Sequence, residues 1–146
     1  MGYPMNDKAI RGGGLMKVLF AILVSVLCCA VMAADLTNSE KKVVADSIRK
    51  ELTDPDSAKF KWVPLVGKTT NAGGSASATY CGLVNSKNRM GGYAGDAPFI
   101  VFLMWVNNKF LSAVVRVGSA NWESTESKSI VETCMSSGYD RLDLAE

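Results

Sequence analysis

One uncharged, apolar run determines which part of this chain can fold as a soluble domain and where that domain is expected to be located. It extends from Val18 to Ala34, is preceded by Lys17 and is followed directly by Asp35 and a polar segment. A basic residue, a short apolar core and small residues at its end are typical of a secretory signal peptide. We therefore expect cleavage before Ala34 or Asp35, and export of the rest of the chain as a periplasmic or extracellular protein.

The same run has a second interpretation as a retained anchor helix. It lies at the lower limit of the roughly 17 to 25 residues that span a bilayer, so we favour the signal peptide, and an uncleaved leader is the only membrane contact that we expect. Met1–Leu15 fits neither a leader nor a domain, and the Arg11–Gly14 string before Met16 is typical of a translated ribosome-binding site. The predicted division is 1–15 as a misassigned upstream start, 16–34 as a signal peptide and 35–146 as one mature domain.

Export also reduces the number of possible disulfide pairings. Cys28 and Cys29 are removed with the leader, which leaves Cys81 and Cys134. Two cysteines in an oxidising compartment most simply form one disulfide. Chain-entropy reasoning gives such a cross-link about 4 kcal/mol of stabilisation, which is a large share of the stability of a small domain.

The mature domain carries no net formal charge. The whole chain has 16 basic and 14 acidic residues, and positions 1–34 hold three basic residues and one acidic residue, which leaves thirteen of each. A neutral domain has no general field that attracts nucleic acid or an anionic membrane. We therefore expect no nucleic-acid partner, and a protein or another cell-envelope component instead.

Composition also excludes several kinds of catalytic and metal site. The chain has no histidine, which removes the commonest general base and rules out Ser-His-Asp and Cys-His sites. Two cysteines do not supply the four Cys or His ligands of a structural zinc site. We therefore predict no metal, no cofactor and no catalytic residue, and we favour a protein that is not an enzyme.

Local patterns predict two helices and four strands in the mature domain. Thr37-Asn38-Ser39-Glu40 has the spacing of a capping box, so a helix begins there, and Asp54-Pro55 ends it. A second helix extends from about Thr125 to Ser137, with Gly138 as its C-cap. Alternating or continuous apolar residues predict strands at Phe60 to Trp62, Ala76–Asn85, Phe99–Val106 and, after a turn at Asn107-Asn108, Phe110–Val117.

These elements predict an α+β fold. The economical arrangement is a small antiparallel four-stranded sheet with the N-terminal and the C-terminal helix packed on one face. The disulfide would then join the second strand to the last helix. In the first strand we expect Phe60 and Trp62 to face the core, and Lys59 and Lys61 to face solvent.

Two segments carry a more specific pattern. The first is Leu-Thr-Asp-Pro-Asp-Ser-Ala-Lys-Phe at residues 52–60, and the second extends from Cys81 to Phe99. Together they resemble an uncharacterised family of small exported bacterial and phage-borne proteins, whose members pair an L-x-D-P-x-S-A-x-F segment with C-G-x-V-N-x-K-N-x-x-G-G-Y-x-G-x-x-P-F. The resemblance implies an exported domain with a shared loop, and it transfers no activity.

The loop at residues 86–97 is the candidate site. Irregular loops on a rigid sheet concentrate binding residues, and backbone N–H groups in glycine turns form small concavities for anions. The alternative interpretation is structural: Gly91, Gly92 and Gly95 adopt conformations closed to other residues, the asparagines cap turns and the tyrosine anchors the loop in the core. The candidate binding residues are Asn85, Lys87, Asn88, Arg89 and Tyr93.

Three functions fit these observations. We favour a binding module that acts in the cell envelope as an inhibitor, an immunity protein or a phage exclusion factor. The first alternative is an accessory component of an envelope assembly, which predicts an exposed apolar patch around Trp122 or Tyr139. The second is a small hydrolase, which requires two carboxylates near the loop. Asp96 is the only carboxylate within the loop. Trp122 itself is either a staple or an exposed contact.

Overall fold

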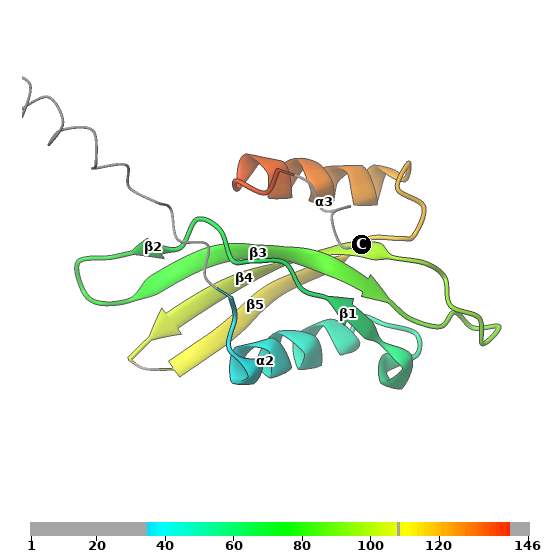
Figure 1. The fold of residues 1–146 in the computed structure, drawn as a ribbon, viewed down its shortest axis with the longest axis horizontal. Coiled ribbons are helices and arrows are strands. Elements are labelled where there is room, and N and C mark those ends of the chain that lie inside the picture. The colour runs from blue at the N-terminus through cyan, green and yellow to red at the C-terminus, as the bar shows by residue number, and fades with distance from the viewer. Residues whose placement is uncertain (1–34, 108, 141–146) are drawn as a thin grey trace, which may run out of the picture. The chain divides into compact units, whose positions relative to one another are not determined.

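The computed structural model describes residues 35–107 and 109–140, which belong to one compact unit. The predicted upstream segment and signal peptide, residues 1–34, lie outside the described residues. In chain order the elements are helix α2 (Asn38–Arg49), the 3-10 turn η1 (Pro55–Ser57), strands β1 (Lys59–Lys61), β2 (Thr69–Thr70), β3 (Ala76–Asn85), β4 (Ala97–Val106) and β5 (Lys109–Val117), and helix α3 (Thr125–Ser136) (Figure 1).

The strands form one antiparallel sheet of five strands in the order β1-β3-β4-β5, with β2 pairing with β3 on the same edge as β1. The predicted bounds of β3 are confirmed, and β4 and β5 begin slightly earlier than predicted. The predicted number of four strands is wrong, because β2 lies in a segment that we expected to be loop. Strand β2 consists of two threonines, which is too short for an alternation of apolar and polar residues, and it forms only by pairing with β3.

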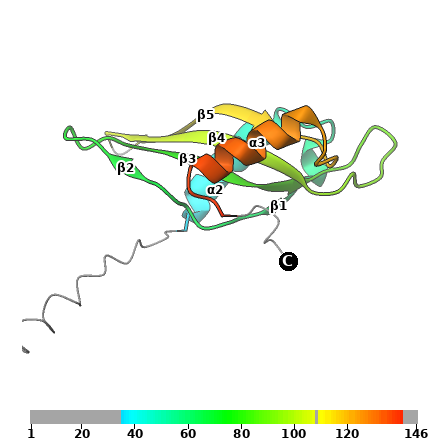
Figure 2. The same cartoon turned by 90° about the horizontal axis from the view of Figure 1, so that it is seen from above.

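The two helices cover opposite faces of the sheet, so their predicted placement on one face is wrong (Figures 1 and 2). Successive strand residues face opposite ways. Tyr80 therefore packs in one apolar cluster with Ile48 of α2, and its neighbour Cys81 packs in a second cluster with Ile130 of α3. The nearly continuous apolar composition of β4 contains the signal for this arrangement, because a strand that is apolar on both sides requires a cover on each face.

Helix α2 begins where the capping box predicts. The hydroxyl of Thr37 accepts from the N–H of Glu40 at 3.3 Å, and the Glu40 carboxylate accepts from the N–H of Thr37 at 2.8 Å. The helix ends at Arg49, before the predicted end at Asp54-Pro55. Pro55 instead opens the separate turn η1, whose N-cap is Asp54.

A tyrosine and a glycine determine the packing at the centre of the sheet. Tyr80 is fully buried, and its hydroxyl donates to the carbonyl of Val63 at 2.8 Å and accepts from the N–H of Val63 at 3.1 Å. Burial raises the pKa of Tyr80 well above its ordinary value, so the hydroxyl stays protonated. Gly82 pairs with Phe99, and a Cβ at this glycine would lie 2.6 Å from the Phe99 ring. Gly82 therefore leaves room for a buried aromatic ring.

The predicted disulfide is present between Cys81 of β3 and Cys134 of α3. Both cysteines are fully buried between the sheet and the helix. The C-cap of α3 is Ser137, one residue before the predicted Gly138, and Gly138 ends the helix in the left-handed conformation with a φ of +97°. The disulfide indicates an oxidising, non-cytoplasmic setting for this domain.

Candidate functional site

The two segments that the sequence singled out meet at one end of the sheet. Lys59 of the first segment pairs with Asn85 of the second, through the β1–β3 ladder. The backbone N–H of Lys87 donates to the Ser57 hydroxyl at 2.8 Å, which joins the turn η1 to the start of the loop. The candidate site is therefore built from both segments, although 20 or more residues separate them in the chain.

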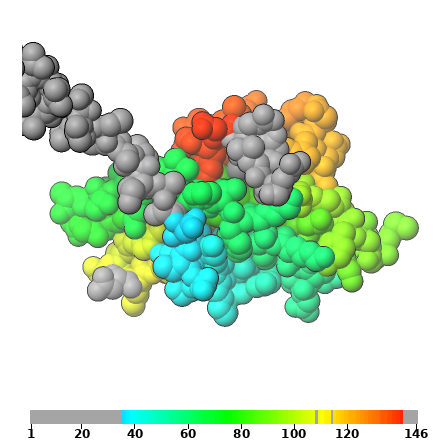
Figure 3. Space-filling model, viewed as in Figure 1, coloured from blue at the N-terminus to red at the C-terminus, as the bar shows by residue number. Residues whose placement is uncertain are grey.

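The loop at residues 86–97, called the finger loop below, projects away from the sheet beyond the ends of β3 and β4 (Figures 1 and 3). Its backbone is braced by its own hydrogen bonds. Lys87 and Tyr93 form an antiparallel bridge, and the N–H of Ala94 donates to the carbonyl of Ser86 at 3.1 Å. The N–H of Gly91 closes the tip by donating to the carbonyl of Asn88 at 2.9 Å. The loop thus has a defined conformation before any ligand arrives.

The two asparagines shape the loop with their side-chain oxygens. Asn88 Oδ1 accepts from the N–H of Met90 at 3.0 Å and from the N–H of Gly92 at 3.2 Å. Asn85 Oδ1 accepts from the N–H of Gly95 at 3.2 Å. The turn-capping interpretation of both residues is therefore confirmed. Their Oδ1 atoms accept hydrogen bonds within the loop, and a role of these two side chains in binding stays a prediction.

The glycines differ in what the backbone requires of them. Gly91 and Gly95 have φ values of +82° and +103°, in the region that favours glycine. Gly92 has no positive φ, and the nearest atom to a Cβ built there is Asn88 Oδ1 at 3.9 Å. The prediction of a conformation closed to other residues is confirmed for Gly91 and Gly95 and wrong for Gly92. The N–H of Gly92 donates to Asn88 Oδ1, and the backbone there has a φ that other residues also adopt.

Tyr93 does not anchor the loop in the core, as the structural interpretation expected. Its side chain is 43% exposed. The ammonium group of Lys59 lies 4.2 Å from the centre of the Tyr93 ring, and that of Lys87 lies 5.8 Å from it. Both distances are within the range of cation–π attraction. The ring therefore positions two ammonium groups at the base of the finger loop.

Lys59 is a site residue that sequence reasoning missed. The alternation of β1 correctly predicted that its side chain faces away from the core, since it is exposed. The prediction gave only the exposure of Lys59 to solvent, because alternation shows the direction of a side chain and not which residues lie beside it on the neighbouring strand. The β1–β3 register, in which Lys59 pairs with Asn85, places Lys59 beside Tyr93, and the sequence alone carries no signal for that pairing.

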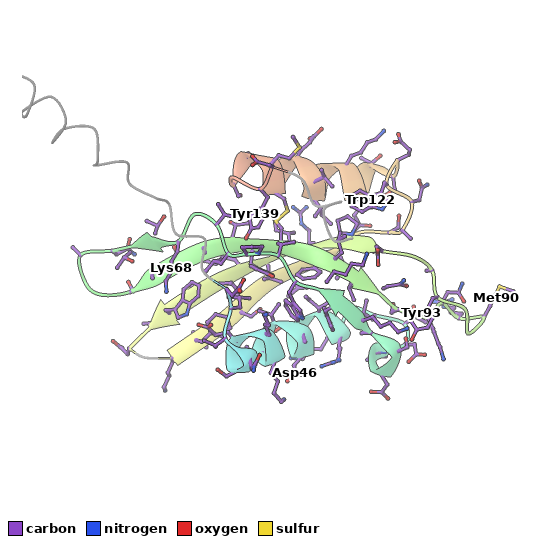
Figure 4. The ribbon with its side chains drawn as sticks, viewed as in Figure 1. Asp46, Lys68, Met90, Tyr93, Trp122 and Tyr139 are labelled. Atoms are coloured by element: carbon purple, nitrogen blue, oxygen red, sulfur yellow. A yellow bond between two sulfur atoms is a disulfide. The ribbon has the colours of Figure 1, made fainter. Side chains whose placement is uncertain are left out.

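The tip of the finger loop offers one apolar and one basic side chain. Met90 is 94% exposed at the outermost part of the loop (Figure 4). Arg89 is also exposed. Within residues 35–107 and 109–140, Lys59, Lys87 and Arg89 form no ion pair. The loop therefore presents three uncompensated cations around an exposed methionine and tyrosine.

A cleft of about 240 Å³ lies behind the base of the finger loop. It is bounded by the residues after α2, by the loop and by the end of β5. Small side chains such as Ala94 and Ala120 line much of it, and Glu51 and Ser86 supply polar atoms. The cleft offers one carboxylate and three hydroxyl groups, the latter from Thr53, Ser86 and Ser119.

The remaining candidates at this end of the domain have structural partners. Asp96 forms an ion pair with Lys61, with an N–O distance of 2.9 Å. Trp122 is half-buried against the α3-side cluster, and its indole N–H donates to the carbonyl of Asp96 at 3.1 Å, so it is a staple and not an exposed contact. Tyr139 is buried. The accessory role, which requires an exposed apolar patch around Trp122 or Tyr139, therefore gains no support from these two side chains.

Comparisons of the chain with protein-family models, with curated proteins and with solved structures found no match. No group of acidic or cysteine residues able to hold a metal ion occurs among the described residues. No helix within the same residues is long and apolar enough to span a membrane. The site must therefore be interpreted from its own geometry.

Proposed function

We propose that this protein is an exported binding module that recognises a protein of the cell envelope through the finger loop. Its place of action is the periplasm or the cell exterior. The observation that carries the proposal is the contrast within the loop. Its backbone is held by hydrogen bonds, while the side chains of Lys87, Arg89 and Met90 form no hydrogen bond or ion pair among the described residues. Methionine, tyrosine and arginine are enriched in protein interfaces.

A braced loop is suited to tight binding for a thermodynamic reason. Ordering a flexible loop at an interface consumes part of the binding free energy, and a loop that is already ordered avoids that loss. A projecting loop also enters a concave surface more readily than a flat sheet does. Both properties favour an inhibitor, an immunity protein or a phage exclusion factor.

The two alternative functions have less support. The accessory role requires an exposed apolar patch around Trp122 or Tyr139, and it gains no support from Trp122, which is half-buried, or from Tyr139, which is buried. The hydrolase requires two free carboxylates, and Asp96 is paired with Lys61 while Asp54 accepts from the N–H of Ser57 at 3.3 Å. Among the described residues that line the cleft behind the loop, Glu51 is the one carboxylate.

Capture from envelope extract with the oxidised mature domain tests the proposal. The parent protein, an Arg89→Ala/Met90→Ala double variant and a Lys109→Ala control are immobilised in parallel. Lys109 is exposed and pairs with Val106 at the end of β4 that lies opposite the finger loop. We expect a protein that the parent and the control retain and the double variant loses. Equal retention by all three would mean that the finger loop does not carry recognition.

A further inference from the structure

We infer that the surface that the finger loop recognises is an acidic recess of a partner protein. This inference rests on the proposed function and adds the chemistry of the partner. In it, a carboxylate of the partner lies between the ammonium groups of Lys59 and Lys87. A second carboxylate pairs with Arg89, and Met90 enters the apolar floor of the recess.

The first contact follows from the arrangement around Tyr93. Two ammonium groups lie near one ring, at 4.2 and 5.8 Å from its centre, and neither has a carboxylate partner among the described residues. The face of an aromatic ring attracts cations but carries no net charge, so the repulsion between the two lysines is only partly offset. A carboxylate placed between them removes that repulsion and gains two charge-assisted hydrogen bonds. The two ammonium groups beside one ring therefore favour an anionic group as their partner.

The second contact follows from the tip. Arg89 and Met90 are adjacent and both exposed, and the turn held by Asn88 fixes the backbone that carries them. A guanidinium binds a carboxylate with two parallel hydrogen bonds, which fixes orientation as well as affinity. A flexible thioether packs into irregular apolar pockets. The tip therefore fits a recess that combines an acidic wall with an apolar floor.

The charge around the loop favours a protein over a membrane or a polyanion. Binding to an anionic membrane surface takes roughly four to eight basic residues in a cluster, and the finger loop and β1 supply three such groups without ion-pair partners among the described residues. Asp54 and Asp56 lie at η1, which contacts the loop through Ser57. These carboxylates repel an extended anionic surface, whereas a compact acidic recess contacts only the finger loop and Lys59 beside it.

Two cross-linking reactions on the oxidised mature domain test the inference. A photo-reactive amino acid in place of Met90 reports any protein that touches the tip, and the same replacement of Met135, which is exposed on α3, is the control. A carbodiimide then joins ammonium groups to adjacent carboxylates. We expect isopeptide bonds from Lys59 or Lys87 to an Asp or Glu of the protein captured at position 90, and none from Lys109.

Affinity for the captured protein supplies the second measurement. Raising NaCl from about 50 to about 500 mM should weaken binding roughly tenfold or more. Lys59→Gln and Lys87→Gln should each weaken it by a similar factor, and Lys109→Gln should leave it unchanged.

The outcomes separate the inference from the proposed function. Capture at position 90 without isopeptide bonds, and with an affinity that salt does not change, would refute the acidic recess and leave the binding module intact. Capture at neither position, or at Met135 alone, would remove the proposed function itself. Binding of the parent to phosphatidylglycerol vesicles, lost in Arg89→Ala/Met90→Ala, would overturn the inference in favour of a membrane surface.

Discussion

The centre of the sheet and the finger loop are held in place by different parts of the chain. In the sheet, buried side chains such as Tyr80, Phe99 and Cys81 supply the packing. In the loop, backbone groups and asparagine oxygens supply the hydrogen bonds, while Arg89 and Met90 contribute none with their side chains. Changes to the buried side chains of the sheet should therefore alter stability. In the loop, changes to the glycines or asparagines should alter stability, and changes to Lys87, Arg89 or Met90 should alter binding.

The disulfide should give the largest effect on stability. Removing the Cys81–Cys134 cross-link by a double Cys→Ser substitution frees a chain loop with a sequence separation of 53 residues. We expect the free energy of unfolding to fall by about 4 kcal/mol and the melting temperature to fall by more than about 10 °C. Denaturation of the exported protein with and without reduction measures it. Two titratable thiols in native, unreduced material would contradict the cross-link.

Gly82→Ala should give the next largest effect. Its Cβ would lie 2.6 and 2.9 Å from two atoms of the Phe99 ring, which is fully buried and has little room to move. Overpacking of this kind costs about 1 to 3 kcal/mol. Chemical denaturation gives the change, and Gly82→Ala with Phe99→Leu should recover part of the loss. A Gly82→Ala protein as stable as the parent would show that the ring at the sheet centre moves freely.

Two adjacent glycines test the backbone of the finger loop. Gly91→Ala places a side chain at a φ of +82° and should cost about 1 kcal/mol. Gly92→Ala is its matched control, because position 92 has no positive φ and open space around its Cβ, so it should change little. Hydrogen exchange of the Gly91 N–H, which donates to Asn88, reports the local effect. Equal behaviour of the two variants would mean that the loop is not braced in solution.

A pH-dependent contact between α2 and the sheet should give a smaller effect. Burial raises the pKa of Glu40, but hydrogen bonds from Trp105, at 2.6 Å, and Thr37, together with the charge of Lys68, outweigh burial and lower it below 4.5. A lowered pKa in the folded state contributes stability above about pH 4.5 that is lost as the pH falls through the folded value. Glu40→Gln should flatten that part of the acid-unfolding curve, by less than about 1 kcal/mol. An unchanged curve would refute this coupling.

Much of the fold can be predicted from local signals. The capping box at Thr37 marked the start of α2, and Gly138 marked the end of α3. The predicted leader contains two of the four cysteines, so only one disulfide pairing remained for the predicted mature domain. Each of these signals acts over a few residues or by elimination, so it does not depend on the tertiary structure.

What sequence reasoning missed depends on contacts across the sheet. Alternation shows that Lys59 faces away from the core, but only the β1–β3 register places it beside Tyr93. The same limit explains the wrong role given to Tyr93, because an aromatic residue in a loop was expected to be buried. Gly92 was misjudged because the side chain of Asn88 holds the backbone there, which the glycine pattern does not show.

The central claim is that the cationic side chains of the finger loop, Lys87 and Arg89, serve recognition and not folding. It is tested most directly by measuring the unfolding free energy and the capture of envelope protein on the same preparations of parent, Lys87→Ala/Arg89→Ala and Lys109→Ala. The account predicts that all three agree in stability to within about 0.5 kcal/mol, and that only the loop variant loses capture. A loop variant that retains every captured protein, or one that is destabilised by several kcal/mol, would contradict the claim.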